Sequence, residues 1–434
     1  MHTGVPFGPV HCRLEKLRPA RSPALIPDRM ITVAVPRETT PGETRVALIP
    51  ASIAPLLKAG VGVRIQAGAG DAAGFSDAEY REAGASIAAT VAETFAGAEV
   101  VLKVREPRAL EGVPGGAGSG HEADLLAEGA VLIGLLNPSA NAALFERLTA
   151  RGVIAYAMEK LPRISRAQKM DVLSSMSTVA GYKAALLAAD SLPRFFPLLM
   201  TAAGTIAPAR VFVLGAGVAG LQTIATARRL GAVVSAFDIR PAVREEVQSL
   251  GATFVATEQL DASAVAAGGY AKEQTEDQQQ RTRELLAKHI AQSDAVITTA
   301  VVPGRRAPVL VTEAMVKGMR RGSVIVDLAA EQGGNCELTE PGRDVVKHGV
   351  QILGPLQLVA QMGTHASQMY ARNISALLLH LIKDGKLHFD WKDEITRETC
   401  VTRAADAAIA GAAPAATGAP VAAGAASNTG GASA

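Results

Sequence analysis

The sequence predicts a protein of the α/β class, in which two doubly wound parallel sheets form two lobes joined by long helices. From Ile31 onward, short β-branched runs alternate with segments whose apolar residues recur at helical spacing, which is the pattern of strand–helix–strand units. A glycine-rich turn stands between a strand pattern and a helix pattern at 211–238. Hydrophobic residues make up 48% of the chain and aromatic residues 4%, so aliphatic side chains must fill the cores.

The first lobe is predicted at residues 31–165 and 350–403. Within the first range, strands are expected at 31–36, 61–68, 99–104, 130–136 and 153–158, with helices at 50–60, 76–85 and 140–152 between them. The helix that follows Ser76 has Glu79 in capping-box register, and the glycine-rich stretch just before it is interpreted as a turn. The strand-like run 350–354 and the helical run 365–385 are expected to pack back onto this lobe.

The second lobe is predicted at residues 166–349. A long helical pattern from Met170 to Leu192 opens it and is expected to link the two lobes. Buried-strand patterns follow the glycine-rich turn at 295–304 and 323–334. Both ends of the chain are expected to lie outside the lobes.

Residues 1–29 are rich in Pro and Arg and lack apolar periodicity, which predicts a disordered extension. Met30 stands directly before the first predicted strand, so an over-long gene model is a simpler explanation of these residues than a transit peptide. Residues 404–434, rich in Ala, Gly and Pro, are expected to form a disordered tail. No segment of the chain is expected to span a membrane.

The glycine-rich turn has the spacing of a Rossmann dinucleotide site. Gly215 permits the tight turn after the strand, and Gly217 lets a pyrophosphate approach the backbone. Gly220 lets the helix lie close to the strand, so that the phosphates would meet the helix N-terminus. The pattern alone also fits a structural relic that no longer binds a nucleotide.

Asp238 ends the next predicted strand, about 20 residues beyond the glycines. A carboxylate there can accept hydrogen bonds from the adenine ribose hydroxyls, which favours NAD over NADP. Arg240 could pair with a 2′-phosphate, but a carboxylate directed at the same place would repel that phosphate. The sequence therefore predicts an NAD site.

Charge and composition exclude several other functions. The net charge is +2 and no basic stripe is interleaved with aromatic residues, so nucleic-acid binding is not expected. Cys12, Cys336 and Cys400 lie far apart without CxxC spacing, which indicates a reducing compartment with neither a disulfide framework nor a zinc site. The eight histidines form no HxxxH pair, so no metal site is expected.

Six segments carry a resemblance to one family. They are GETRVALIP at 42–50, AGAGDAAGFSDAEY at 67–80, PRISRAQKMD at 162–171, GAGVAGLQTIATARRLGA at 215–232, GGYAKE at 268–273 and VDLAAEQGGNCELTEPG at 326–342. Together they closely resemble the NAD(H)-binding component, domain I, of proton-translocating NAD(P) transhydrogenase. The resemblance covers nearly everything from Ile31 to about Arg403.

The resemblance implies the catalytic residues. In that family an arginine, a glutamine and an aspartate surround the nicotinamide ring in the cleft between the two lobes. Here they fall on Arg163, Gln168 and Asp171, with Ser174 following. Without the resemblance this stretch would be interpreted as a polar helix cap with a solvated face. Met176 stands where related chains often carry a glutamine, one turn beyond these residues.

The same resemblance, together with the glycine-rich turn, implies the cofactor-binding residues. They are Ser165, Gly215, Ala216, Gly217, Val218, Gly220, Asp238, Ile239, Arg240, Gly269, Tyr270 and Val301. Tyr270 would belong to a mobile loop that closes over the bound nucleotide, and Val301 would line the adenosine side. Without the resemblance, that loop is merely a surface loop rich in Gly and Gln.

The resemblance further implies the reaction and the partners. NADH bound here would give a hydride, Si-specifically, to NADP⁺ on a separate beta subunit, domain III. A separate membrane-spanning subunit, domain II, would couple the transfer to proton translocation. The chain itself would be a homodimer, cytoplasmic and held peripherally at the cytoplasmic face of the bacterial inner membrane through these partners.

Hydride transfer between two nicotinamides moves no proton at the reacting carbon, so the site needs positioning groups and no general acid or base. The sequence agrees with this requirement, because His121 is the only histidine between Ile31 and Gly215.

Two alternatives remain open at this point. Alanine dehydrogenase shares the fold and similar segments, but it uses a lysine in a KEP motif and a histidine in an HLA motif. Here Arg105 stands at the lysine position, and Asn137 with Pro138 at the histidine position. An arginine cannot shed its proton near neutral pH. The other alternative is a non-catalytic NAD sensor or scaffold.

Overall fold

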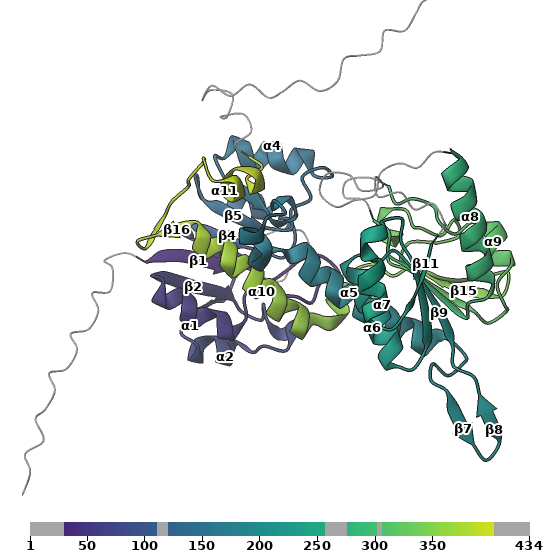
Figure 1. Cartoon of the computed structure of the whole chain (residues 1–434). Helices are drawn as coiled ribbons and strands as arrows, with labels where there is room; N and C mark the ends of the chain where they lie inside the picture. The colour runs from purple at the N-terminus through teal and green to yellow at the C-terminus, as the bar shows by residue number, and fades with distance from the viewer. Residues whose placement is uncertain (1–29, 111–119, 257–275, 302–305, 403–434) are drawn as a thin grey trace, which may run out of the picture.

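Two separate sheets form the cores of two lobes (Figure 1). The computed structural model describes residues 30–110, 120–256, 276–301 and 306–402. The expected N-terminal extension at 1–29 and the tail at 404–434 lie outside the described residues. The two-lobed α/β class that the sequence predicts is confirmed.

The first sheet has six strands in the order β3-β2-β1-β4-β5-β6, and all its neighbours pair in parallel. Its strands are β1 Ile31–Val35, β2 Val61–Gln66, β3 Ser86–Ala88, β4 Val100–Leu102, β5 Val131–Gly134 and β6 Ile154–Ala157. The α-helices between them are α1 Pro50–Lys58, α2 Asp77–Glu82, α3 Val91–Phe95 and α4 Ala142–Ala150. The predicted capping box at α2 is confirmed, since Glu79 N donates to Ser76 Oγ and Ser76 N donates to Glu79.

Short 3₁₀ turns complete the first lobe. They are η1 Asp71–Ala73, η2 Glu122–Leu125, η3 Met158–Lys160 and η4 Ser165–Met170. The first of these lies in the glycine-rich stretch that the sequence analysis interpreted as a turn, between Gly68 and Gly74, which both have positive φ.

The second sheet repeats the same winding with one extra strand, in the order β11-β10-β9-β12-β13-β15-β14. Its strands are β9 Arg210–Leu214, β10 Val233–Phe237, β11 Thr253–Val255, β12 Ala295–Thr298, β13 Val324–Asp327, β14 Asp344–Lys347 and β15 Val350–Leu353. Its helical elements are α6 Val218–Arg229, η5 Pro241–Val243, α7 Arg244–Ser249, α8 Glu276–Ala291, α9 Glu313–Lys317 and η7 Ala330–Gln332. The strand order reverses between β9 and β12, and in such sheets ligands bind at this reversal, outside the carboxyl ends of the strands.

One strand lies in the other lobe from the one expected. The sequence predicts the run at 350–354 in the first lobe, but β15 pairs in parallel with β13, with Ile352 opposite Ile325. Val350 and Ile352 of β15 are buried in a core cluster of the second lobe, which accounts for its place there. A tight hairpin at His348 and Gly349, which both have positive φ, joins β15 to the edge strand β14, and this antiparallel pair breaks the otherwise parallel order of the sheet.

The helix α5, Val172–Ser191, joins the two lobes (Figure 1). Val172, Met176 and Val179 in its N-terminal half belong to the first core, whereas Ala184 and Ala188 belong to the second. Within the described residues, α5 is also long and apolar enough to cross a membrane by length and composition, although no span is expected from the sequence. Its apolar character follows from its position, because a helix packed into two cores is apolar on several faces.

After β15 the chain returns to the first lobe through η8 Leu358–Met362 and α10 Gly363–His380. Ala366, Tyr370 and Leu377 of α10 are buried in the first core. The chain continues through β16 Ile382–Lys383, β17 Lys386–Leu387 and α11 Glu394–Thr399.

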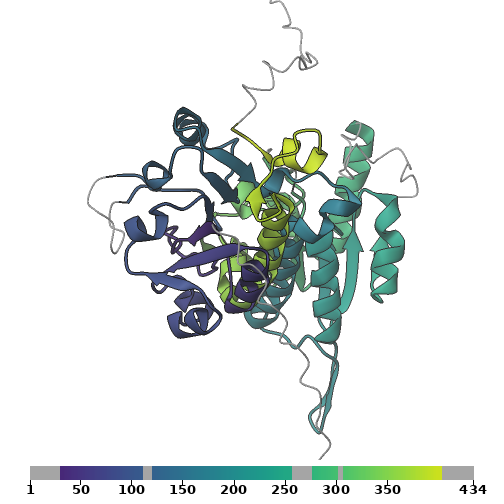
Figure 2. The same ribbon diagram turned by 90° about the vertical axis from the view of Figure 1, so that its left-hand side faces the viewer.

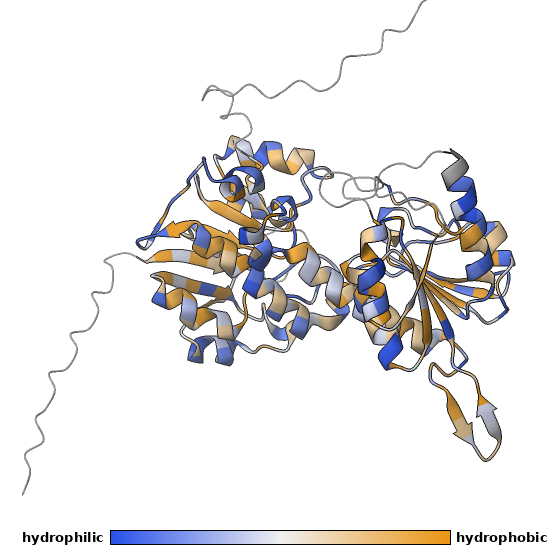
Figure 3. Ribbon diagram, viewed as in Figure 1, coloured by the Kyte–Doolittle hydropathy of each residue, from blue (hydrophilic) through white to orange (hydrophobic). Residues whose placement is uncertain are grey.

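A short hairpin projects from the second lobe, away from both sheets (Figures 1 and 2). It consists of β7 Leu199–Thr201 and β8 Gly204–Ile206. Most of the apolar residues of the two sheets are covered by helices, but the hairpin carries apolar residues in the open (Figure 3). Met200 and Ile206 in the hairpin are 80% and 43% exposed, and Leu198, directly before it, is 53% exposed.

Candidate functional site

The glycine-rich turn between β9 and α6 needs glycine for steric reasons. Gly215 has φ +98°, and a Cβ on it would lie 2.6 Å from Thr299 Oγ1. A Cβ on Gly220 would lie 1.9 Å from the carbonyl oxygen of Gly215, so the helix packs directly on the turn. At Gly217, by contrast, the nearest atom to a Cβ would be Arg240 Nη2 at 3.9 Å. The turn is therefore open at the glycine where a pyrophosphate would approach.

Asp238 follows β10 and is 7% exposed. Its Oδ2 accepts a hydrogen bond from the backbone N–H of Ala216 at 2.8 Å, which ties the carboxylate to the glycine turn. The side chain of Arg240 donates to both carboxylate oxygens, from Nε at 2.9 Å and from Nη2 at 2.8 Å. The Arg240 backbone N–H donates to Oδ1 as well, at 2.9 Å. These four bonds match the four lone-pair positions of a carboxylate, so a ribose hydroxyl can bind there only by displacing one of them.

A loop after β12 lies against the glycine turn and is held by Asn335, a residue whose role sequence reasoning missed. Thr299 Oγ1 donates to the carbonyl oxygen of Gly215 at 3.0 Å. The side chain of Asn335 accepts from Ala300 N at 3.0 Å and donates to Ala300 O at 2.8 Å, which fixes the backbone just before Val301. Val301 itself is 38% exposed at the edge of this loop.

Asn335 is held in turn by Asp327, a fully buried carboxylate at the end of β13. Asp327 accepts from the backbone N–H groups of Ala329, Asn335 and Cys336 and from the hydroxyls of Thr298 and Thr339. A polar residue that ends an otherwise apolar strand run was the available sequence signal for both Thr298 and Asp327.

The residues implied at the nicotinamide lie at the entry to α5. Arg163, Ser165 and Gln168 are exposed on the approach to this helix, and they are anchored by the buried side chain of Ala167. Asp171 is the N-cap of α5: its Oδ1 accepts from Ser174 N at 2.9 Å and its Oδ2 from Ser174 Oγ at 2.6 Å. Asp171 therefore has the geometry of a polar helix cap, as the alternative interpretation expects. A cap can also contact a bound nucleotide, so the two roles are compatible.

Two contacts from the C-terminal segment hold this loop in place. Asn373 Nδ2 of α10 donates to the carbonyl oxygen of Lys169 at 2.8 Å. Arg166 pairs with Asp393, the N-cap of α11, at 2.8 Å. Neither Asn373 nor Asp393 had a sequence signal, because both lie some 200 residues away along the chain.

The helix α5 connects the two halves of the site. A Cβ on Gly181 would lie 2.1 Å from the carbonyl oxygen of Ala219, in the first turn of α6, and Thr223 Oγ1 donates to the carbonyl oxygen of Gly181 at 3.0 Å. From Asp171 to Gly181 the helix rises about 15 Å, at roughly 1.5 Å per residue. The implied nicotinamide residues and the glycine turn are thus set at a fixed separation by one helix. Gly269 and Tyr270 lie outside the described residues.

The first lobe contains a buried charge cluster at the ends of β1 and β4. Lys103 is fully buried and pairs with Glu122 at 3.1 Å and with Glu38 at 3.6 Å. Arg105 Nε lies 3.1 Å from Glu43 Oε2. Arg45 donates two hydrogen bonds to the same carboxylate, from Nε to Oε1 and from Nη2 to Oε2. At the position of the alanine dehydrogenase lysine, this chain therefore carries a guanidinium already paired with a carboxylate.

Burial raises the pKa of Glu38 from 4.5 to about 7, although Lys103 lowers it. A raised carboxyl pKa in the folded state contributes stability that is fully present below about pH 4.5 and is lost as the pH rises through about 7. In urea unfolding, we expect the free energy of unfolding of the wild-type chain to fall over this range relative to that of Glu38→Gln. The glutamine side chain of this variant cannot titrate, and its one oxygen can still accept the shorter of the two backbone bonds, from the N–H of Val104, while the longer bond from the N–H of Arg105 to the other oxygen is lost. Parallel pH profiles for the two chains would contradict this assignment.

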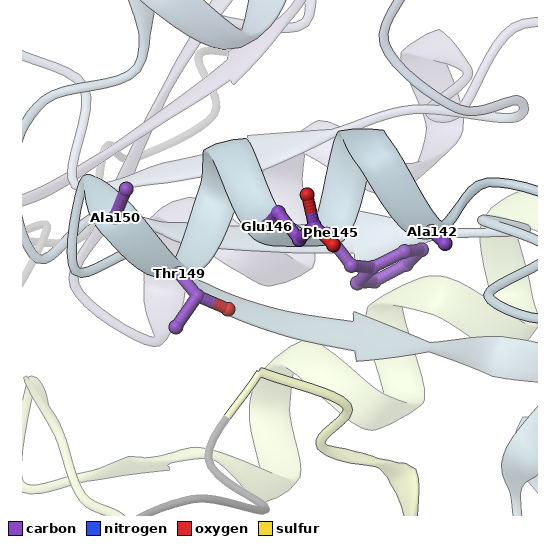
Figure 4. A pocket seen from close by; sticks show the side chains of 5 residues that line it. All are labelled: Ala142, Phe145, Glu146, Thr149 and Ala150. Atoms are coloured by element: carbon purple, nitrogen blue, oxygen red, sulfur yellow. The ribbon is translucent and has the colours of Figure 1, made fainter.

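A hollow of about 610 Å³ lies beside α4, on the outside of the first lobe (Figure 4). Ala142, Phe145, Glu146, Thr149 and Ala150 line it. It contains none of the predicted site residues. Across the described ranges, no group of three or more His, Cys, Asp and Glu residues is arranged to hold a metal ion.

Comparison with known proteins gives a consistent result. The family models for the alanine dehydrogenase/PNT N-terminal and C-terminal domains match residues 34–180 and 184–409. The chain is 48% identical over 380 residues to an NAD(P) transhydrogenase subunit alpha chain of Rhodospirillum rubrum, covering 87% of this chain and 97% of that one. It is 34% identical over 319 residues to alanine dehydrogenase of Halomonas elongata, covering 71% of this chain and 75% of that one. Among solved structures, the transhydrogenase from Sinorhizobium meliloti matches with a TM-score of 0.76 and 43% identity, covering 86% of this chain and 98% of that one.

Proposed function

The chain belongs to the alanine dehydrogenase/PNT family, among its transhydrogenase alpha subunits, and from this premise we propose that it binds NADH and donates a hydride to NADP⁺ carried by another subunit. The observation that carries the proposal is that a single helix joins the two parts of the site. One helix, α5, has the implied nicotinamide residues at its N-terminus and packs against the glycine turn at Gly181. A protein that bound only the adenosine half of NAD, such as a sensor, would not need a helix that connects the glycine turn to the implied nicotinamide residues.

The residues present fit NAD. The open turn at Gly217 with the N-terminus of α6 would receive the pyrophosphate, and Asp238 would bind the adenine ribose once part of its bonding to Arg240 is exchanged. Arg163, Gln168 and Asp171, with Ser174 supporting Asp171, would orient the nicotinamide amide. Bound NADH would supply the hydride at its C4. The chain's own task is to hold that ring so that its reactive face points outward, where a second nucleotide can meet it.

We propose that the acceptor nucleotide is held by a separate NADP-binding beta subunit, domain III, and that a membrane-spanning subunit, domain II, couples the transfer to proton translocation. The chain would then lie at the cytoplasmic face of the inner membrane, attached through these partners. The transfer would be Si-specific. The names of the relatives as alpha subunits of a multi-subunit enzyme support these partners.

Alanine dehydrogenase is the alternative, and the pairing of Arg105 with Glu43 argues against it. The test is a steady-state assay of NADH oxidation by the purified chain with pyruvate and ammonium. We expect no turnover, because the position that needs an ionisable lysine holds a paired guanidinium. Turnover in this assay would overturn the proposal in favour of alanine dehydrogenase.

We also propose that the chain forms a homodimer and that the hairpin of β7 and β8 contributes to it. Met200, Leu198 and Ile206 expose apolar side chains at 80%, 53% and 43%, and such surfaces are commonly covered by a partner. Met200→Asp should raise the dimer dissociation constant by about tenfold or more, because it places a charge in an apolar contact. Sedimentation velocity across a concentration series measures it. The control is Thr201→Asp in the same hairpin: equal effects of the two variants, or no effect of Met200→Asp, would contradict the proposal.

A further inference from the structure

Asp238 and Arg240 form a bidentate ion pair beside the glycine turn. The guanidinium of Arg240 donates to both oxygens of Asp238, at 2.8 and 2.9 Å, and is 24% exposed. The Arg240 backbone N–H reinforces the pair. Asp238 is 7% exposed and cannot turn away, because Ala216 N–H holds its Oδ2.

This guanidinium lies where a nucleotide would arrive. Its Nη2 is the nearest atom to the open side of Gly217, at 3.9 Å from the position of a Cβ. In Rossmann sites a carboxylate at the end of this strand binds the ribose 2′-hydroxyl, and in NADP enzymes a nearby arginine takes the 2′-phosphate instead. This chain has both groups within one hydrogen-bond length of each other.

We propose that the chain carries a latent binding site for the 2′-phosphate of NADP(H), formed by Arg240 and masked by Asp238. This rests on the proposed function, in that the same turn must bind NAD. In the wild-type chain Asp238 acts twice against NADPH: its charge repels the phosphate, and its two oxygens occupy the guanidinium that could bind the phosphate. Arg240 is then a residue that could determine specificity for NADPH, but its pairing with Asp238 prevents it from binding the phosphate.

Masking of Arg240 and simple repulsion of the phosphate by Asp238 predict different effects when Asp238 is removed. If Asp238 only repelled phosphate, its removal would relieve repulsion and Arg240 would not matter. If Asp238 masks Arg240, its removal creates a new charge-assisted contact, and the gain in NADPH affinity depends on Arg240. A hydrogen bond to a charged group contributes about 1.5–3 kcal/mol, which corresponds to roughly 10- to 150-fold in affinity.

The experiment measures the Kd of NADH and of NADPH for four chains by titration of nicotinamide fluorescence. They are the wild type, Asp238→Ala, Asp238→Ala with Arg240→Ala, and Asp238→Ala with Arg229→Ala. The matched control Arg229 is an exposed arginine in the last turn of α6, at the end of the helix away from the glycine turn. We expect Asp238→Ala to weaken NADH about tenfold and to tighten NADPH at least tenfold. Arg240→Ala should abolish the gain, and Arg229→Ala should preserve it.

No gain for NADPH in Asp238→Ala, or a gain that survives Arg240→Ala, would overturn the latent site. If Asp238→Ala does not fold, Asp238→Asn carries the same test, because an amide oxygen can still accept from Ala216 N–H while the charge is gone. Failure of the proposed function is a different result: the wild-type chain would then bind neither nucleotide. A wild type that binds NADH, with variants that gain nothing, rejects the latent site alone.

Discussion

Asp171→Ala should lower the rate of hydride transfer by about 100-fold or more while raising the Kd for NADH by about tenfold or less. The side chain caps α5 through Ser174 and, in the proposed function, fixes the nicotinamide rather than the adenosine half. A misplacement of the reacting carbon by about 1 Å is enough for a loss of this size. The measurements are single-turnover stopped-flow transfer for the rate and fluorescence titration for the Kd.

A helix cap alone could also explain a defect at this position, since losing an N-cap costs about 1 kcal/mol of stability. Asp171→Asn separates the two roles, because asparagine caps a helix about as well as aspartate does. We expect the Asn variant to keep the wild-type melting temperature and to remain defective in transfer, since an amide presents a donor where the carboxylate presents two acceptors. A wild-type rate of hydride transfer in Asp171→Asn would show that Asp171 acts only as a helix cap.

Gly181→Ala should weaken NADH binding by about tenfold or more and lower the rate of hydride transfer about 100-fold. The new Cβ would lie 2.1 Å from the carbonyl oxygen of Ala219, so α5 and α6 must move apart. Overpacking of this kind costs about 1–3 kcal/mol of stability. The displacement acts on both halves of the site, because α6 begins at the glycine turn and α5 begins at Asp171.

Gly62→Ala is the matched control, since the same methyl group there would meet its nearest neighbour, Met30 Cε, at an ordinary 3.5 Å. We expect it to bind NADH and transfer hydride like the wild type. Thermal unfolding shows whether Gly181→Ala is folded at the assay temperature. A folded Gly181→Ala chain with wild-type binding and transfer would contradict the role given to the crossing of α5 and α6.

Local patterns were sufficient to predict the turn, the caps and the connecting helix. Gly215 needs its positive φ in the turn itself, and Gly220 packs on the carbonyl oxygen of Gly215, so both requirements arise within one strand–turn–helix unit that the spacing indicates. The capping box at Ser76 is equally local. The linking role of α5 followed from a long helical pattern placed directly before the glycine-rich unit, and α5 does enter both cores.

Contacts between distant segments could not be predicted in the same way. The prediction for strand β15 was wrong because a short apolar run fits the core of either lobe, and its pairing with β13 depends on packing with distant segments of the second lobe. Asn335 and Asp327 were missed because their role depends on hydrogen bonds that reach the loop before Val301. The bidentate ion pair between Arg240 and Asp238 depends on a side-chain conformation, which a single sequence does not specify.

The roles assigned to Arg163, Gln168, Ser165, Gly269 and Tyr270 remain predictions of the family resemblance. Their distribution is nonetheless informative. The segment 163–169 is held by Asn373 and Asp393 of the C-terminal segment, so the first lobe would determine where the implied nicotinamide residues lie. In the proposed function, the second lobe would determine the position of the adenosine half, through the glycine turn and Asp238.

The most direct measurement of the central claim follows the hydride itself. NADH labelled with deuterium at the transferred C4 position is mixed with this chain and a separately purified NADP-binding component of a transhydrogenase, and NADPH is isolated for mass analysis. We predict that deuterium appears in NADPH only when both proteins are present, and that Asp171→Ala suppresses its appearance. Deuterium that reaches free NADP⁺ equally well without the second component, or that never reaches NADPH in the mixture, would contradict a hydride-donating subunit.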